Sequence, residues 1–481
     1  MDSWKEDVDC CLWDGVTCED ETGNVIGLDL SSRGLHRNID SSSSLFNLSH
    51  LQRLNLANND FHSSEISPMF GRFPNLTHLN QSNSSFAGDI PFDLSHLSRL
   101  VSLDLSYSLG LRLDTSVYNA LARNLTQLRE NFLSTVNMAL VHPNMLLNLS
   151  SSLTSLNVVG SGIRGNFPAA YSRSLPNLQL LELSENIDLT GSLREFNWTI
   201  SLKYLDLSFC GFTGVLPKSR GNLTKITHIF LQYNSFGGEI PAASISNLAQ
   251  LQFLNLLGNN FQGRIPNAFE NLSKLTFINL EGNRFTGQLP TSIFNLTKVS
   301  YMDLSGNQLI GPFPEYATGL SKLRRLDLSD NILNGTIPPW LVSLPLLQYL
   351  FLQDNLLTGN IREIKGFSLS VIDLTNNKLC GPVPRFTFEL ENLNYLRLSS
   401  NNLSGVVEID MFQKLKNLQE LDLSGNRLLS LDTTHNFNFT LPSLTNLLLS
   451  SRDIKEFPHV LKAFTGILDL SNNQIHVPIP Q

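Results

Sequence analysis

The sequence carries little charge for its length. Charged residues make up 16% of the 481 residues, against roughly 25% in an ordinary soluble domain. The formal net charge is −8 and there is no basic run, so we expect no nucleic acid partner. No stretch approaches the ~20 apolar residues that cross a bilayer. The polar segment DSWKED follows Met1 directly, so a signal peptide and a membrane anchor are expected to lie outside this chain.

Motifs for catalysis are also missing. The sequence contains no G-x-S-x-G, no H-E-x-x-H and no phosphate-binding loop. Its ten histidines show no metal-ligand spacing. We therefore expect a protein that is not an enzyme and that needs neither a metal nor another cofactor.

Cysteine is scarce, with five residues, and Cys10, Cys11 and Cys18 cluster near the N-terminus. Such a cluster indicates a disulfide in an oxidising compartment. A Cys11–Cys18 bridge closes a short loop, and Cys10 is then left to pair with a cysteine upstream of this chain. Thirteen N-x-[ST] sequons also favour secretion, although some of them are the NLS or NLT that the repeat pattern produces without any need for glycosylation. The sequon asparagines are Asn47, Asn75, Asn80, Asn83, Asn124, Asn148, Asn197, Asn222, Asn271, Asn295, Asn334, Asn402 and Asn438.

What the sequence does contain is a repeat of about two dozen residues. Residues 302–338 contain the pattern L-x-L-x-x-N-x-L-x-G-x-[IF]-P twice, 24 residues apart. This pattern is the signature of a leucine-rich repeat. Leu326 and Leu328 are two residues apart, so on a strand both face the interior of one coil. Asp327 is expected to face outward, as are Ser329 and Asp330. Asn331 is expected to bond backbone groups that the turn leaves unpaired.

One coil cannot bury its leucines alone, so the coils must stack. The first leucine of each L-x-L marks 19 starts, spaced 21 to 28 residues apart. The starts are residues 28, 54, 79, 103, 131, 156, 181, 205, 229, 254, 278, 302, 326, 350, 372, 396, 421, 447 and 468. Each start predicts a short strand in a parallel concave sheet. The x-x-L-x-x-L stretch that follows, such as Leu320 with Leu323, is expected to be helical or 3₁₀.

The expected fold is an α/β solenoid, a right-handed superhelix of about 19 leucine-rich repeats. Residues 1–25 are not a repeat and are expected to form part of an N-terminal cap, with Trp4 and Trp13 covering the first coil. Residues 26–481 form the solenoid, with an irregular excursion near 107–125 and a departure from the repeat near 427–457. The sequence stops at PIPQ within a repeat, so the C-terminal cap is expected to be missing and the chain to be a fragment or a truncated product.

Three positions depart from the repeat. Gln81 and Asn131 stand where an inward leucine is expected, and a buried amide without partners costs about 1–3 kcal/mol. Either these coils are locally loose, or this copy of the gene has drifted. Cys210 takes the asparagine position of its repeat, which indicates a structural role.

The cap sequence DCCLWDGVTC, followed by LxxLxxLxLxxNxFxGxIP repeats, resembles the plant extracellular leucine-rich repeat proteins over nearly the whole chain. Within that group it is most similar to the receptor-like proteins of plant immunity, such as the fungal-resistance receptors of tomato. Residues 28–39 and 42–61 carry much of this similarity.

The resemblance implies an ectodomain on the extracellular face of the plant plasma membrane, anchored by a C-terminal segment absent from this chain. It also implies signalling through a partner receptor kinase, as co-receptor or adaptor. Two alternatives stand beside it. One is a soluble inhibitor of microbial cell-wall hydrolases, and the other is the ectodomain of a peptide-hormone receptor kinase.

Aromatic side chains form the candidate ligand-binding row on the concave face. Most residues just before the L-x-L of nine successive repeats are aromatic, and other aromatics stand beside them. Such a row suits recognition of a protein or peptide, and stacking of rings between neighbouring coils explains it equally well. The expected ligand-binding residues are Tyr204, His228, Phe230, Tyr233, Phe253, Phe277, Tyr301, Arg325, Tyr349, Phe351 and Tyr395.

Phe230, Tyr233 and Phe351 replace the usual Asp and Ser of the repeat, so they favour recognition. Acidic residues are expected on the same face and would meet a basic ligand, although most of them are simply the D of LDLS. They are Asp303, Asp327, Asp330, Asp354, Asp373 and Asp422.

Overall fold

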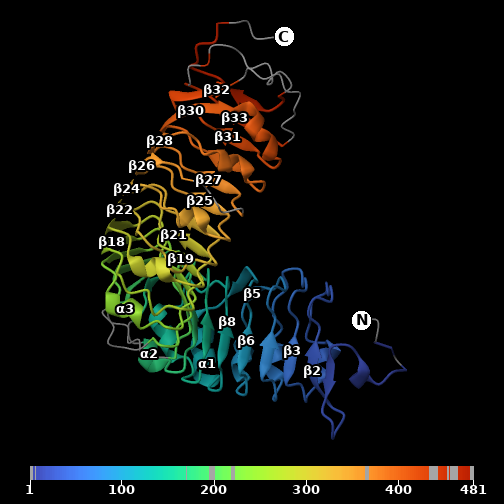
Figure 1. Cartoon of the computed structure of the whole chain (residues 1–481). Coiled ribbons are helices and arrows are strands. Elements are labelled where there is room, and N and C mark those ends of the chain that lie inside the picture. Colours follow the sequence, from blue (N-terminus) through green and yellow to red (C-terminus); the bar gives the residue numbers. More distant parts are fainter. Residues whose placement is uncertain are drawn as a thin grey trace. The chain divides into compact units, whose positions relative to one another are not determined.

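A computed structural model of the chain divides it into two compact units, Met1–Gly237 (unit 1) and Gly238–Gln481 (unit 2), coloured blue to green and green to red in Figure 1. It describes residues 4–5, 7–168, 171–193, 201–217, 223–362, 368–432, 443–451, 454 and 464–476. Each unit is a stack of leucine-rich repeat coils, so the predicted solenoid architecture is confirmed.

The first sheet of unit 1 begins with an antiparallel pair, in which Val16 faces Leu28. Each following strand then pairs in parallel with the strand of the next coil, for example Leu54 with Leu79. The strands are β1 (Val16–Cys18), β2 (Val25–Asp29), β3 (Arg53–Asn55), β4 (His78–Asn80), β6 (Ser102–Asp104), β8 (Glu130–Phe132), β9 (Ser155–Asn157), β11 (Leu180–Glu182), β13 (Tyr204–Asp206) and β15 (His228–Phe230).

Unit 2 repeats this arrangement, with Leu326 paired to Met302 on one side and to Leu350 on the other. All 19 predicted starts lie within strands of the two units, so the prediction of one short strand per coil is confirmed. The strands of unit 2 are β17 (Phe253–Asn255), β19 (Phe277–Asn279), β21 (Tyr301–Asp303), β23 (Arg325–Asp327), β25 (Tyr349–Phe351), β27 (Val371–Asp373), β29 (Tyr395–Arg397), β31 (Glu420–Asp422), β33 (Asn446–Leu448) and β34 (Ile467–Asp469).

A second set of parallel strands follows the asparagine turn of many coils. In unit 1 these are β5 (Ala87–Asp89), β7 (Gly110–Arg112), β10 (Gly165–Asn166), β12 (Leu189–Ser192), β14 (Gly211–Val215) and, at its end, β16 (Ser235–Gly238). In unit 2 they are β18 (Asn260–Arg264), β20 (Arg284–Gly287), β22 (Gln308–Gly311), β24 (Ile332–Gly335), β26 (Leu356–Asn360), β28 (Lys378–Gly381), β30 (Asn402–Glu408) and β32 (Leu428–Asp432). Where a coil carries G-x-[ILFV]-P, as at Pro338, the proline follows the second strand because it has no N–H to donate to the next coil.

Short helices return the chain to the next strand. The longest is α1 (Thr115–Asn124), within the segment where an excursion is predicted, and its N-cap Asp114 accepts a hydrogen bond from the N–H of Val117 at 2.9 Å. The others are α2 (Tyr171–Ser174), α3 (Ala242–Ser246), η1 (Cys10–Leu12), η2 (Ser44–Asn47), η3 (Pro68–Arg72), η4 (Phe92–His96), η5 (Pro143–Asn148), η7 (Thr291–Asn295), η8 (Leu341–Ser343), η9 (Arg385–Glu389) and η10 (Ile409–Lys414). Among the described residues, no helix is long and apolar enough to cross a membrane.

The predicted helical stretch at Leu320 and Leu323 is wrong. Residues 315–323 contain no helix, and Leu320 has a positive φ of 64°. The preceding Gly319 lies against the backbone of Asn295, and the Leu320 N–H bonds the carbonyl oxygen of Leu296 at 2.8 Å. The chain therefore follows the coil before it instead of closing a helical turn.

The asparagine turn joins neighbouring coils. The side chain of Asn331 accepts a hydrogen bond from the N–H of Leu309 at 3.0 Å, and its Nδ2 donates to the carbonyl oxygen of Leu304 at 3.1 Å. Nδ2 also donates within its own coil, to the Leu328 and Ser329 carbonyl oxygens. A side chain that bonds four backbone groups in a dry interior fixes each coil to the preceding one.

Two coils of unit 1 carry the expected buried amides. Gln81 is completely buried, and neither polar atom of its side-chain amide has a hydrogen-bond partner. Oδ1 of Asn131 is also buried without a partner. Cys210 occupies its asparagine position as predicted, with Sγ 3.2 Å from the carbonyl oxygen of Leu183, and burial raises the pKa of its thiol to about 12.

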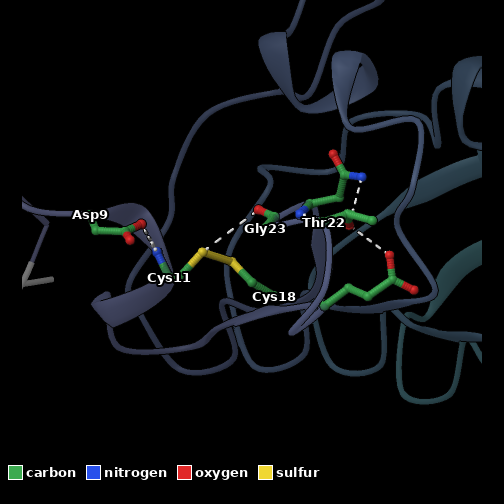
Figure 2. Close-up of a disulfide and its surroundings, with 7 residues drawn as sticks. Asp9, Cys11, Cys18, Thr22 and Gly23 are labelled. Carbon is green, nitrogen blue, oxygen red and sulfur yellow. Dashed lines mark hydrogen bonds between the residues drawn. A yellow bond between two sulfur atoms is a disulfide. The ribbon is translucent and has the colours of Figure 1, made fainter.

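The N-terminal segment packs two tryptophans and a disulfide beside β1. The rings of Trp4 and Trp13 stack with centroids 4.9 Å apart. A disulfide joins Cys11 and Cys18 (Figure 2). Asp9 starts the short helix that carries Cys11 by accepting a hydrogen bond from the Cys11 N–H at 2.9 Å. Near 427–457, where a departure from the repeat is predicted, β32 and β33 are formed, and residues 433–442, 452–453 and 455–457 lie outside the described residues.

Candidate functional site

The surface considered as a site is the solvent side of the first sheet, here called the strand face and described for each unit separately. In most of its three-residue strands the middle residue is buried and the two flanking residues are partly exposed. The alternation of side chains along a strand produces this pattern. The strand face is therefore lined by the first and third residues of each strand and by the residues that lead into the asparagine turn.

In unit 2 an aromatic row runs from coil to coil over β17, β19 and β21; Figure 1 labels the last two of these strands. The rings of Phe253 and Phe277 stack with centroids 5.8 Å apart, and those of Phe277 and Tyr301 at 4.5 Å. All three side chains keep part of their surface exposed. Ring stacking between coils is thus present, and it leaves an aromatic surface open to solvent.

Arg325 continues this row. Its guanidinium carbon lies 4.5 Å from the ring centroid of Phe351 and 5.6 Å from that of Tyr301. Its Nη2 donates to Oδ2 of Asp327 at 2.9 Å, while its buried Nε has no partner. A guanidinium between two rings and a carboxylate is held in one orientation.

Asp327 and Ser329 are buried, so the solvent exposure implied by an outward position is absent, although Asp327 does lie on the strand face, where it pairs with Arg325. Asp303 and Asp373 are buried as well, because the neighbouring side chains of the face close over them. Burial and the charge of Asp303 raise the pKa of Asp327, and burial with Asp303 raises the pKa of Tyr301 to about 12. Among the expected acidic residues, Asp330 and Asp354 are exposed at turn positions with positive φ, and Asp422 is half-buried.

The remaining residues of the expected row differ in exposure. Tyr349 is exposed and Phe351 is half-buried beside Arg325. The hydroxyl of Tyr395 donates to Gln419 at 2.8 Å, and the guanidinium carbon of Arg397 lies 5.5 Å from the Tyr395 ring centroid. Arg397 also pairs with Glu420, with 2.6 Å between Nε and Oε1. Sequence reasoning missed Arg397, although it holds the same place in its strand as Phe351.

Unit 1 carries its own aromatic group. The ring of Tyr204 stacks on His228 at 5.2 Å and lies 5.5 Å from the ring of Phe230. Burial lowers the pKa of His228, so its imidazole is more readily neutral. Burial and the carboxylates of Glu182 and Asp206 raise the pKa of Tyr204. An aromatic surface therefore adjoins two carboxylates.

Two exposed aromatics follow β13 and β15 in the same coils. Tyr233 stacks on Phe209 with centroids 4.6 Å apart, and the two side chains are 49% and 47% exposed. Both precede the asparagine-type position of their coils, and both have a positive φ, 54° and 52°. Bulky side chains are rare in that conformation, and other coils mostly place Gly or a polar residue there, as at Gly258 and Asn83, although Tyr107 adopts it as well. Phe209 was not predicted, although its place in the repeat matches that of Tyr233.

The structure places ten of the thirteen sequon asparagines. Asn47, Asn83, Asn148, Asn271, Asn295, Asn334 and Asn402 are exposed, and Asn75, Asn80 and Asn124 are half-buried. Asn197, Asn222 and Asn438 lie outside the described residues.

Comparison with protein-family models identifies the repeat directly. A leucine rich repeat model matches residues 200–261, 313–357 and 367–428, and a second leucine rich repeat model matches residues 50–73 and 274–296. These matches fall in both units.

Curated relatives of the chain include plant receptor-like proteins. Receptor-like protein 6 of Arabidopsis thaliana is 40% identical over 236 residues, which are 48% of this chain and 24% of that protein. Receptor-like protein Cf-9 of Solanum pimpinellifolium is 41% identical over 226 residues, 47% of this chain and 26% of that protein. The chain spans about a quarter of the length of these relatives.

Solved structures with the same fold include plant receptors. A TDR receptor superposes with a TM-score of 0.82 at 27% identity, covering 93% of this chain and 76% of that one. The Arabidopsis receptor kinase HAESA, in complex with the peptide hormone IDA and the co-receptor SERK1, has a TM-score of 0.53 at 26% identity and covers 88% of this chain and 90% of that one.

Proposed function

Because this chain is a leucine-rich repeat protein whose homologues are plant receptor-like proteins, we propose that it is the ectodomain of such a cell-surface receptor. In this proposal the chain lies on the extracellular face of the plasma membrane and binds an extracellular protein or peptide, derived from a pathogen, on its strand face. It does no chemistry of its own. Binding is passed on through a partner receptor kinase.

One observation carries the proposal, namely the half-exposed aromatic row of unit 2 and the fixed guanidinium beside it. Phe277, Tyr301 and Phe351 present ring surface to solvent, and Arg325 is held against two of these rings. Rigid aromatic and arginine side chains are the residue types that dominate binding energy in protein interfaces.

A second candidate is the ectodomain of a receptor kinase for a peptide hormone. The similarity to HAESA in its complex with a peptide hormone and a co-receptor favours it. Both candidates place the ligand on the strand face and need a partner kinase domain or kinase protein. They differ in the segment that follows the ectodomain, so the sequence of the full transcript distinguishes them.

Two variants matched in exposure test the strand face. Tyr349→Ala removes a 38% exposed ring from the strand face, and Ile332→Ala removes a 44% exposed side chain from the second sheet. The purified chain is immobilised, a binding protein is isolated from extracellular microbial fractions, and its dissociation constant is measured for each variant. We expect Tyr349→Ala to weaken binding about tenfold, as for a central aromatic contact, and Ile332→Ala to leave it unchanged. The reverse order would place the ligand elsewhere and overturn the proposal.

A further inference from the structure

The aspartate between the two leucines of a strand has a fixed local role. Oδ1 of Asp206 accepts hydrogen bonds from the N–H and the hydroxyl of Ser208, at 2.9 and 2.6 Å. Asp327 and Ser329 repeat this arrangement in unit 2. One carboxylate oxygen of the aspartate thus shapes the turn. The negative charge of the carboxylate still needs a positively charged partner on the strand face.

In unit 2 the chain itself supplies the balancing group for two of these aspartates. Nη2 of Arg325 forms an ion pair with Oδ2 of Asp327 at 2.9 Å. Nη1 of Arg397 does the same with Oδ2 of Asp373 at 3.4 Å. Each arginine also lies over an aromatic ring of the same face. The unit therefore contains its own example of a guanidinium bound between a ring and a carboxylate, which is a favourable site for a planar cation.

At one place in unit 1 the described residues supply rings and carboxylates but no paired cation. Tyr204 and Asp206 hold the same two places on β13 as Tyr301 and Asp303 on β21. Glu182 precedes them by one coil, at the position paired in register with Asp206. Among the described residues, no ion pair includes Glu182 or Asp206. Burial raises the pKa of both carboxyls, and the charge of Asp206 raises that of Glu182 further.

We infer that the ligand supplies this cation, as an arginine side chain of an extracellular peptide or protein loop that lies over Tyr204 and Phe230 and pairs with Glu182 and Asp206. The inference rests on the proposed function, because it names the chemistry of a ligand for the same strand face. The net charge of −8 favours a basic partner. Arginine fits better than lysine because a flat guanidinium can stack on a ring while it bonds a carboxylate.

The exposed pair Phe209 and Tyr233 extends this site. Their rings stack on each other, at backbone positions with a positive φ that bulky residues rarely adopt. A stacked aromatic surface next to the cation site accepts an apolar side chain. The ligand segment is therefore basic and apolar in neighbouring residues.

Two short peptides test the inference on the full chain. The probes are acetyl-Gly-Gly-Arg-Phe-Gly-Gly-amide and its citrulline analogue, which keeps the shape of arginine and loses the charge. Binding is measured by saturation-transfer NMR and titration. We expect the arginine peptide to bind about tenfold more tightly than the citrulline peptide. Equal binding of the two peptides, or binding of neither, would overturn the inference.

Variants locate the effect and separate it from folding. Asp206→Asn and Glu182→Gln should abolish the preference for arginine, while their melting temperatures stay at or above that of the unmodified chain because a desolvated charge has been removed. Asp104→Asn is the matched control, since Asp104 holds the same place on β6 and bonds Ser106 but follows Ser102 instead of an aromatic residue. An arginine preference retained in Asp206→Asn and Glu182→Gln would contradict the assignment. A natural ligand that binds these two variants with unchanged affinity would overturn the inference and leave the proposed function standing.

Discussion

Arg325 and Phe351 lie on neighbouring strands of unit 2, with the guanidinium carbon 4.5 Å from the ring centroid. The same guanidinium neutralises Asp327, which would otherwise be a buried and unpaired carboxylate. The Arg325 side chain therefore has two roles. It stabilises the fold by pairing with the buried Asp327, and it packs against the partly exposed ring of Phe351.

Replacing Arg325 by glutamine should destabilise the protein in a pH-dependent way. Burial and Asp303 already raise the pKa of Asp327, whereas Arg325 lowers it, so the variant leaves Asp327 with a still higher pKa. Near pH 7 the unpaired charge costs about 1–2 kcal/mol, less than a fully buried pair would, because Arg325 is partly exposed. As the pH falls through the pKa of Asp327, this carboxyl takes up a proton and the loss shrinks.

Melting temperatures of Arg325→Gln at pH 7 and pH 4 check this, each compared with the unmodified chain at the same pH. Arg324→Gln removes a neighbouring, exposed arginine and serves as the control. A difference that stays constant or grows at low pH would refute the role given to Asp327.

Replacing Gln81 by leucine should stabilise unit 1. Gln81 is fully buried with both polar side-chain atoms unpartnered, at a position where the repeat calls for leucine. Removing that amide should raise the free energy of unfolding by about 1–3 kcal/mol. Chemical denaturation measures it, with the exposed Gln52→Leu as the control. A loss of stability in Gln81→Leu would show that the coil needs the amide.

Replacing Asn307 by alanine should destabilise unit 2 strongly. Its side chain accepts a hydrogen bond from the Phe285 N–H and donates to three carbonyl oxygens, among them that of Leu280 in the preceding coil. The variant leaves these backbone groups buried and unpaired, at a cost of about 3 kcal/mol or more. Gln308→Ala, at the next and exposed position, should change the denaturation midpoint little. Equal midpoints for the two variants would argue against the asparagine turn as a link between coils.

Cysteine reactivity should differ between Cys10 and Cys210, which both lie in unit 1. Cys210 is buried, and a pKa of about 12 leaves almost no thiolate at pH 8. Cys10 is partly exposed and has no disulfide partner in the structure. Mass spectrometry after brief treatment with iodoacetamide should find Cys10 modified and Cys210 unmodified until the protein is denatured. Rapid modification of Cys210 in the folded chain would contradict its structural role.

The residues of the repeating interior could be predicted from the sequence, whereas the burial of individual side chains on the strand face could not. Leu326, Leu328 and Asn331 act within a periodic pattern, so spacing alone predicts their burial and bonding. The burial of Asp327 depends on Arg325 in its own strand and on Phe351 in the next coil, 24 residues further along. Leu320 does not form the predicted helix because the backbone of the preceding coil holds it in a turn.

Within the candidate site, the pattern of aromatic residues was visible and the carboxylate partners were not. Tyr204 and Phe230 could be selected by type and position. Glu182 stands in the preceding coil and resembles an ordinary polar residue of the repeat, so only the parallel register reveals that it adjoins Asp206.

Hydroxyl-radical footprinting of the aromatic side chains, with and without a bound ligand, tests the central claim most directly. The account predicts that a ligand lowers the oxidation rates of Tyr349 and Phe351 several-fold while Tyr316, which is 70% exposed and lies away from the strands of the first sheet, reacts as before. Protection of Tyr316 with unchanged rates at Tyr349 and Phe351 would show that the ligand binds elsewhere and that the strand face is not the recognition surface.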